Sequence, residues 1–382
     1  MGRRTWAVRV VLVCALGAVA EGCEPKRDPK AEAEGHYLKG QSEYLRGNFD
    51  AALAAFAEVK RLNPDEPKLP VAIGEVYLAQ GKLPDAQKQF EAAVVRDPKR
   101  ATSWSRLGYI QAQLGQVEAA RGSLERALRL NPSDFNALEA RAELAIKAGD
   151  VDAAVRDYAA AGRLAPEPSR PGLYLKAASL LDKRNRRKEA QAVLEDAVGH
   201  GAKSAELFSL LGDLRVKAGE LSQAAEAYEQ AALLSPKDAG PWELVGRIRA
   251  RLQQPEEAEA AFRESLKVED RTAVHVELAR LALQRDDRQG AQAELDKALS
   301  AGGATDATAA EMEDLAELLL VFDRKKDALA LYKLLAGEPD AAGNVELQLK
   351  LARLARELKD RAVQDEACAR VTAARGKRVA CP

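Results

Sequence analysis

Residues 101–134 read ATSWSRLGYIQAQLGQVEAARGSLERALRLNPSD and decide the fold of this chain. Two segments with the apolar spacing of amphipathic helices, 101–114 and 116–130, make up the stretch. Between them stands Gly115, which suits the left-handed turn that follows a helix, and Pro132 cannot continue the second segment. The stretch therefore predicts a hairpin of two helices.

The same pattern recurs along most of the sequence. The residue equivalent to Ala120 returns at steps of 33 to 37 residues, as Ala52, Ala86, Ala120, Ala154, Ala190, Ala224, Ala258, Ala291 and Ala328. A small residue of the preceding segment accompanies each of them, as Gly40, Gly74, Gly108, Ala142, Ala178, Gly212, Gly246, Ala279 and Ala316. An aromatic residue or leucine follows each alanine, as Phe56, Phe90, Leu124, Tyr158, Leu194, Tyr228, Phe262, Leu295 and Tyr332. Two helices that cross closely need small residues where their backbones approach and large residues beside them to fill the core.

These units resemble the tetratricopeptide repeat, whose W-x-x-L-G, A-x-x-x-L/F-x-x-A and P signature is present at the family spacing in residues 101–134. The resemblance implies an all-α fold, a right-handed α-solenoid of about nine helix-turn-helix repeats over residues 33–342. Residues 343–382 lack the signature and are expected to form capping helices and a tail. The stretch 166–171 is longer than the register allows, and we expect a seam or hinge there.

Composition limits the classes of protein to which the chain can belong. Of its 382 residues, 47% are hydrophobic but only 5% aromatic, which is typical of an alanine-rich repeat array rather than a bulky globular core. Charged residues make up 31% and nearly cancel, at a net charge of −1. No long basic run lies inside the repeats, so nothing indicates binding to nucleic acid.

The N-terminus has the features of an export signal. Residues 1–22 contain arginines followed by an apolar run over 10–20, which is shorter than the roughly 20 residues needed to span a bilayer. Two cleavage sites compete. Residues 18–20, Ala-Val-Ala, suit ordinary signal peptidase. Residues 20–23, Ala-Glu-Gly-Cys, resemble the lipobox of bacterial lipoproteins, in which the cysteine, here Cys23, carries the lipid.

The polar residues 23–32 are expected to form a tether between the anchor and the first repeat. If Cys23 is acylated, Cys368 and Cys381 remain as a pair that could close a short C-terminal loop through a disulfide. We therefore expect a lipoprotein on a membrane of the bacterial envelope, facing the periplasm. A soluble periplasmic protein is the alternative.

Residues with catalytic or metal-binding chemistry are sparse and far apart. The three histidines, His36, His200 and His275, fall in different repeats, and His275 is expected to pack in a helix rather than to bind a metal. Metalloprotease, nucleophile-elbow and phosphate-loop motifs are absent from the sequence. We therefore expect no enzyme: no catalytic residues, no cofactor, no metal and no small-molecule substrate.

The repeat family offers instead a long concave surface, lined by the first helix of each unit. Transferring the family's inward-facing positions to this sequence gives candidate partner-binding residues, Tyr37, Gln41, Tyr44, Val71, Glu75, Leu78, Ser105 and Tyr109, which Glu139 and Glu143 continue. Their aromatic and apolar members would anchor a segment of a protein partner. Alternatively some of them, Tyr44 and Leu78 especially, are half-buried packing residues. The C-terminal half presents a more basic stripe that could meet an acidic segment, Glu206, Asp213, Lys217, Glu243, Arg247, Arg251 and Arg280.

The resemblance thus implies a non-catalytic scaffold of the bacterial cell envelope that binds protein partners. It could help to assemble a pilus, a secretion pore or an outer-membrane complex. The alternative is a soluble periplasmic adaptor for a polysaccharide or peptidoglycan system.

Overall fold

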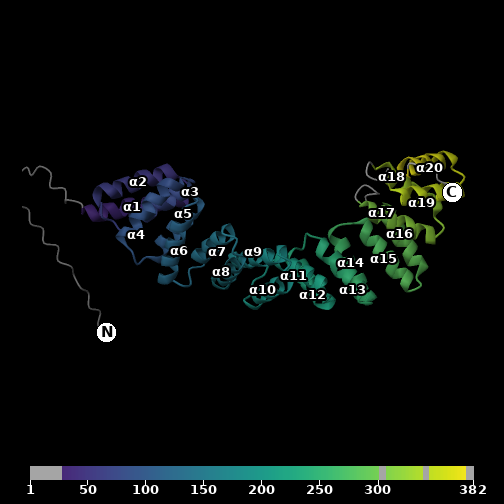
Figure 1. The fold of residues 1–382 in the computed structure, drawn as a ribbon, viewed down its shortest axis with the longest axis horizontal. Coiled ribbons are helices and arrows are strands. Elements are labelled where there is room, and N and C mark those ends of the chain that lie inside the picture. The colour runs from purple at the N-terminus through teal and green to yellow at the C-terminus, as the bar shows by residue number, and fades with distance from the viewer. Residues whose placement is uncertain (1–27, 301–306, 339–343, 376–382) are drawn as a thin grey trace, which may run out of the picture. The chain divides into compact units, whose positions relative to one another are not determined.

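The computed structural model describes residues 28–300, 307–338 and 344–375, and within these ranges the chain is helical and contains no strand (Figure 1). The predicted signal peptide, Cys23 and Cys381 lie outside the described residues. The chain forms two compact units, here unit 1 and unit 2, which divide between Leu144 and Ala145. The all-α repeat fold predicted from the sequence is confirmed.

The helices follow one another in pairs. Unit 1 contains α1 (Pro29–Leu45), α2 (Phe49–Leu62), α3 (Leu69–Ala79), α4 (Leu83–Arg96), α5 (Ala101–Gln113), α6 (Val117–Leu130) and most of α7 (Phe135–Lys147). Unit 2 continues with α8 (Val151–Leu164), α9 (Ser169–Lys183), α10 (Arg187–Gly199), α11 (Ala205–Ala218), α12 (Leu221–Leu234), α13 (Gly240–Arg251) and α14 (Pro255–Val268). It ends with α15 (Thr272–Gln284), α16 (Arg288–Ser300), α17 (Ala309–Val321), α18 (Lys325–Gly337), α19 (Val345–Glu357) and α20 (Arg361–Arg375).

Each of the ten described hairpins turns through one residue with a positive φ. Glycine holds this position in five hairpins, with φ between 71° and 83°: Gly47, Gly81, Gly115, Gly149 and Gly219. In the other five, φ lies between 56° and 61°: Asn185, Gln253, Asp286, Asp323 and Lys359. The N–H of the next residue donates to the carbonyl five positions back, as from Asn48 to Glu43 and from Asp360 to Ala355. This bond closes the end of the first helix in every hairpin.

The helices predicted as a cap, α19 and α20, form a tenth hairpin with this same turn at Lys359. Counted from the turn, Ala352 takes the place of the small residue in the first helix. Gln364 stands where the other repeats have alanine, and Cys368 stands where they have an aromatic residue or leucine. Because of these two residues the repeat signature is missing from this part of the sequence, although the hairpin fold is present.

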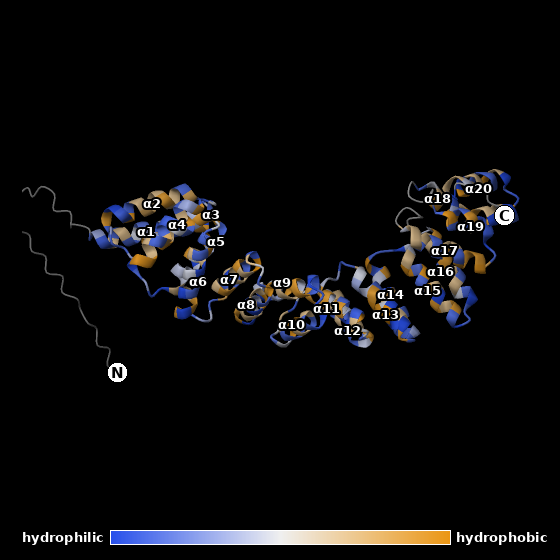
Figure 2. Cartoon of the chain, in the orientation of Figure 1, coloured by the Kyte–Doolittle hydropathy of each residue, from blue (hydrophilic) through white to orange (hydrophobic). Residues whose placement is uncertain are grey.

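Close helix crossings explain the alternation of small and large residues. A Cβ atom added to Gly246 would lie 2.6 Å from the Phe262 ring, and one added to Gly74 would lie 2.8 Å from the Phe90 ring. The equivalent alanines of the second helices, such as Ala120, are fully buried. The outer faces of the helices are polar, so that apolar and polar residues divide each helix lengthwise (Figure 2).

Two expectations about boundaries need correction. Helix α1 begins at Pro29, so residues 29–32 of the predicted tether are helical. Proline is suited to the first position of a helix, and the Asp28 carboxylate accepts a hydrogen bond from the Lys30 N–H at 3.0 Å.

The longer stretch 166–171 is not where the compact units divide, because the division falls inside α7. Helices α8 and α9, on either side of that stretch, pack closely. A Cβ atom on Gly162 would come within 2.7 Å of the Tyr174 ring, which is itself fully buried. The extra residues are therefore absorbed in the loop without opening the core.

Candidate functional site

A groove of about 230 Å³ lies in unit 1 between α5 and α7, which are the first helices of two consecutive hairpins. Both helices present toward it residues of the surface that the resemblance predicts to be concave. The lining residues are Ser105, Arg106, Tyr109, Asn136, Glu139, Ala140 and Glu143. Four of them, Ser105, Tyr109, Glu139 and Glu143, were expected at inward-facing positions, and the structure brings these four together.

Tyr109 is the large apolar side chain of this groove. It is 38% exposed, whereas Ser105, one turn earlier on α5, is 5% exposed and forms part of the floor. Next to it, Arg106 Nε donates to Glu75 Oε1 at 2.9 Å and so links α5 to α3. An exposed ring beside hydroxyl, amide and carboxylate groups can hold a partner side chain by packing and by hydrogen bonds.

Three residues of the groove were not expected from the sequence. Asn136 and Ala140 lie on the same face of α7 as Glu139 and Glu143, at the spacing of three and four residues that brings helical side chains together. That spacing was the signal that could have found them. Arg106 differs, because its ion pair with Glu75 depends on the packing of α5 against its neighbours and leaves no local pattern in the sequence.

The structure places Tyr37 inside the first hairpin, so partner binding by Tyr37 stays a prediction that its packing does not favour. Its side chain is only 9% exposed, and its ring packs against Phe56 with the two centroids 5.7 Å apart. Burial raises the pKa of the Tyr37 hydroxyl, and the negative charge of Glu66 raises it further. Tyr37 is a core residue of the first hairpin.

The remaining apolar candidates are packing residues as well. Tyr44 is half-buried beside Phe49, with ring centroids 6.2 Å apart. Val71 and Leu78 are half-buried against the apolar cluster around Phe90. Gln41 is exposed on α1 but does not line the groove between α5 and α7. The alternative reading of Tyr44 and Leu78 is therefore the one that the structure supports.

Several members of the more basic stripe expected in unit 2 form ion pairs, either between helices or within α13. Lys217 contacts Asp182 of α9 at 3.5 Å, and Arg280 contacts Asp314 of α17 at 3.0 Å. Glu243 holds Arg247 at 2.8 Å. Because these cations already have carboxylate partners, the stripe is a poor candidate for capturing an acidic segment.

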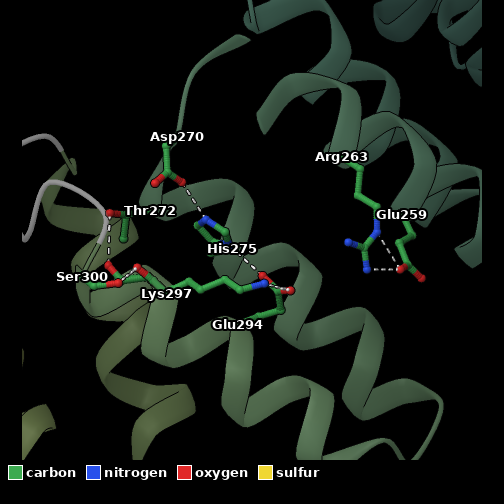
Figure 3. A network of polar contacts seen from close by, with 9 residues as sticks. Glu259, Arg263, Asp270, Thr272, His275, Glu294, Lys297 and Ser300 are labelled. Carbon is green, nitrogen blue, oxygen red and sulfur yellow. Dashed lines mark hydrogen bonds and ion pairs between the residues drawn. The ribbon is translucent and has the colours of Figure 1, made fainter. Parts of the chain in front are cut away.

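His275 packs in α15, as expected, and forms the centre of a polar network in which His275 and Glu294 are buried and Asp270 is exposed (Figure 3). Its Nε2 atom lies 2.7 Å from Asp270 Oδ1 and its Nδ1 atom lies 2.6 Å from Glu294 Oε2. The ring thus bridges a carboxylate of the loop before α15 and a carboxylate of α16. The two carboxylates contact different ring nitrogens and therefore do not converge on one metal position.

Glu294 also accepts a hydrogen bond from Lys297 Nζ at 2.8 Å. Burial by itself would raise the pKa of Glu294, but the hydrogen bonds from Lys297 and His275 outweigh burial and lower it. The network joins the loop before α15 to α16, so we interpret it as a structural contact that holds these segments together.

Other candidate features are limited in the described ranges. No group of three or more histidine, cysteine, aspartate or glutamate side chains there is arranged to hold a metal ion. None of the helices described is both long and apolar enough to cross a bilayer. Cys368 is half-buried on α20 and takes part in a disulfide. Its pairing with Cys381 stays a prediction.

Comparisons with known proteins agree with the repeat architecture. The sequence model of the tetratricopeptide repeat matches residues 26–67, 71–134, 112–168, 175–241 and 209–273. Tetratricopeptide repeat protein 37 of Xenopus laevis is 23% identical over 210 residues, which are 53% of this chain and 13% of that protein. The peroxisomal targeting signal receptor of Komagataella phaffii is 27% identical over 237 residues, 59% of this chain and 40% of the receptor.

Among solved structures, that of the MamA protein is similar, with 22% identity and a TM-score of 0.40, covering 45% of this chain and 92% of MamA. The chain spans less than half the length of the two curated relatives, so their similarity concerns the repeats and not whole proteins. Tetratricopeptide repeat proteins in general mediate protein–protein interactions and are not catalysts. Since the family model matches more than half of its residues, this chain belongs to the tetratricopeptide repeat family.

Proposed function

We propose that this protein is a non-catalytic scaffold of the bacterial cell envelope, which binds a segment of a partner protein in the groove between α5 and α7. The observation that carries the proposal is the convergence of Ser105, Tyr109, Glu139 and Glu143 on one groove. Tyr109 supplies an exposed aromatic ring, a residue type enriched at the anchor points of protein interfaces, and the other three side chains supply hydrogen-bonding groups around it.

The size of the groove favours a protein segment over a small molecule. At about 230 Å³ it is smaller than the roughly 300–1,000 Å³ of pockets that enclose drug-sized ligands. It can take a side chain of a partner, while the rest of the partner lies along the surface of α5 and α7. A partner segment that extends along several repeats would make further contacts, as is usual for solenoid surfaces.

The groove is tested by capture of partners with the full chain. In a variant with Tyr109→Ala and Glu143→Lys, recovery of the bound partners should fall about tenfold, because an anchor is lost and a charge is reversed. Val95→Ala is the matched control, since Val95 is 80% exposed on α4 and lies outside the groove. Equal recovery by wild type and the groove variant, with helix content unchanged, would show that partners bind elsewhere.

Anchoring through Cys23 is the second part of the proposal, and the residues concerned are 20–23, Ala-Glu-Gly-Cys. An intact mass of the mature N-terminal fragment from a membrane preparation tests it. A diacylated or triacylated Cys23 at the N-terminus supports a lipoprotein that works in an envelope assembly such as a pilus, a secretion pore or an outer-membrane complex. A fragment that starts at Glu21 without lipid would contradict anchoring and favour the soluble adaptor, because residues 18–20 are then the cleavage site.

A further inference from the structure

A second and larger groove lies in unit 2, over α11 and between α10 and α12. Its volume is about 640 Å³. Phe208 and Leu211 of α11 form an apolar floor together with Ala227 of α12. At its edge Val198, the residue before the end of α10, is 38% exposed. The groove does not share residues with the one between α5 and α7, and its role does not depend on the function proposed above.

Gly199, the last residue of α10, leaves one edge of the groove without a side chain. The position of Gly199 can be compared between repeats by counting nine residues from the recurring alanine of each second helix. Most repeats carry a larger residue there: Arg61, Val95, Arg129, Arg163, Leu233, Lys267 and Ser300. Glycine stands at this position only at residues 199 and 337. A Cβ atom added to Gly199 would meet no heavy atom within 4 Å, so the space beside it is empty.

The second glycine, Gly337, also stands at a groove, but a smaller one. It lines a groove of about 250 Å³ between α18, α19 and α20. There Gln348 takes the place of Phe208, and Arg370 takes the place of Gln230 and donates a hydrogen bond across the groove to the Ala336 carbonyl. Polar side chains thus line part of this smaller groove, whereas Phe208 contributes to an apolar floor over α11.

The walls of the groove over α11 are predominantly acidic. Glu195, Glu226 and Glu229 line it, against the single guanidinium of Arg215. Arg215 is paired with Glu195 at 3.1 Å, and Arg249 from α13 is paired with Glu229 at 2.8 Å. Glu226 is exposed and makes no ion pair or side-chain hydrogen bond within the described part of the chain. An apolar floor beside an unpaired carboxylate is complementary to an apolar side chain flanked by positive charge.

The occupant that fits these features is a helix. The lining residues of α12 are spaced as Glu226, Glu229 and Gln230, and Leu233, one turn further along this face, is 65% exposed. A helix laid between α10 and α12 would place its apolar side chains on the floor and its basic side chains toward Glu226. We propose that the groove over α11 is a docking site for an amphipathic helix of a partner protein whose apolar face is flanked by lysine or arginine.

The test measures fluorescence anisotropy of a labelled helical peptide of about four turns with the full chain. The peptide carries leucines on one face and lysines on both flanks, and a second peptide has glutamate in place of every lysine. The lysine peptide should bind and the glutamate peptide should bind at least about tenfold more weakly. Equal affinities of the two peptides would overturn the proposal.

Two variants locate the binding. Gly199→Leu fills the space beside the floor, and Glu226→Lys reverses the charge of an exposed wall residue, so each should weaken binding of the lysine peptide about tenfold or more. The control is Gly172→Leu on α9, where an added Cβ also meets nothing within 4 Å. Unchanged binding in Gly199→Leu and Glu226→Lys would contradict the site.

Two other occupants are separable outcomes. If the wild type self-associates in sedimentation and Gly199→Leu abolishes the association, a second copy of this chain fills the groove and the proposal is wrong. If Gly199→Leu removes binding of an apolar dye while neither peptide binds the wild type, the groove takes a small apolar molecule and the proposal is equally wrong. Circular dichroism of each variant verifies that the helices are intact.

Discussion

The residue with positive φ in each hairpin turn is glycine in five hairpins and a larger residue in the other five. A left-handed conformation costs a residue with a side chain about 1–2 kcal/mol relative to a right-handed one, and glycine avoids this cost. Gln253 adopts φ 58° between α13 and α14. Gln253→Gly should therefore raise the free energy of unfolding by about 1 kcal/mol.

Chemical denaturation followed by circular dichroism measures this change. The reverse substitution, Gly219→Gln in the preceding hairpin, should lower the free energy of unfolding by a similar amount, since Gly219 has φ 83°. A Gln253→Gly protein that is less stable than the wild type would contradict the assignment of this turn.

Glycines at the helix crossings carry a different constraint, which is space. A Cβ atom on Gly246 would lie 2.6 Å from the Phe262 ring, so Gly246→Ala should destabilise the protein by about 1–3 kcal/mol. Adding Phe262→Leu should recover part of the loss, because Ala178 and Leu194 form the same pair in the fifth hairpin.

The matched control is Gly122→Ala on α6, where an added Cβ meets nothing within 4 Å. In a helix with free space this substitution should stabilise by about 0.5–1 kcal/mol. Thermal melts of the single and double variants give the coupling between residues 246 and 262. Additive effects of the two substitutions would show that the ring does not limit the space at residue 246.

The Glu294 carboxylate makes the free energy of unfolding depend on pH in the acidic range. Its pKa in the folded protein lies below the ordinary 4.5, so its contribution is present at neutral pH and is lost as the pH falls through the folded-state pKa. The free energy of unfolding of Glu294→Gln should therefore fall less steeply below about pH 4.5 than that of the wild type.

Urea denaturation at neutral and acidic pH compares the two slopes. Glu269→Gln is a suitable control, because the Glu269 side chain is 66% exposed and lies 4.0 Å from Arg271. Identical acid slopes for wild type and Glu294→Gln would mean that the contacts of Glu294 with His275 and Lys297 do not stabilise the fold.

How far the sequence predicts individual residues depends on the kind of constraint. The crossing alanines and glycines of the first nine hairpins were predictable, because spacing alone identifies them. Tyr37 was not, since an inward-facing position on the first helix is not distinguishable in sequence from one that packs on Phe56. The contacts of His275 with Asp270 and Glu294 likewise depend on how α15 and α16 pack.

At the scale of helices, periodicity predicted the elements, including the two helices after residue 343, whereas the repeat signature did not identify them as a tenth hairpin. Gln364 and Cys368 replace the alanine and the aromatic residue of the pattern, yet α19 and α20 turn at Lys359 as the other pairs do. The turn requires only that one backbone residue adopt a positive φ. Lys359 does so, although a left-handed conformation is unfavourable for a residue with a side chain. Core side chains can therefore diverge while the hairpin persists.

The apolar cluster at the C-terminal end of unit 2 includes residues of α17, α18 and α19, among them Leu319, Leu335 and Leu351. Removing residues 344–382 would expose this cluster, because a repeat buries its apolar face only against its neighbours. Amide hydrogens of α17 and α18 should then exchange faster in hydrogen-exchange mass spectrometry. Those of α11 and α12 should be unaffected. Unchanged protection of α17 and α18 would show that α19 and α20 are not part of their core.

At the scale of the whole molecule, several residues on the surface of the described first helices are used for internal contacts. Lys217, Arg280 and Lys350 pair with carboxylates of neighbouring repeats, and Tyr44, Val71 and Leu78 are half-buried. The groove between α5 and α7 is the place where candidate residues from two hairpins converge in unit 1. The family resemblance predicted the binding surface but not the position of the groove on it. That position depends on which side chains of the surface already form contacts within the chain.

The most direct test of the binding function places a photo-crosslinking amino acid at position 109, in the groove, and in a second protein at position 95 on α4. Tyr109 is 38% exposed and Val95 is 80% exposed, so exposure alone would favour crosslinks from position 95. Our account predicts a discrete crosslinked partner from position 109 and none from position 95. Crosslinks from position 95 alone, or the same partners from both positions, would contradict it.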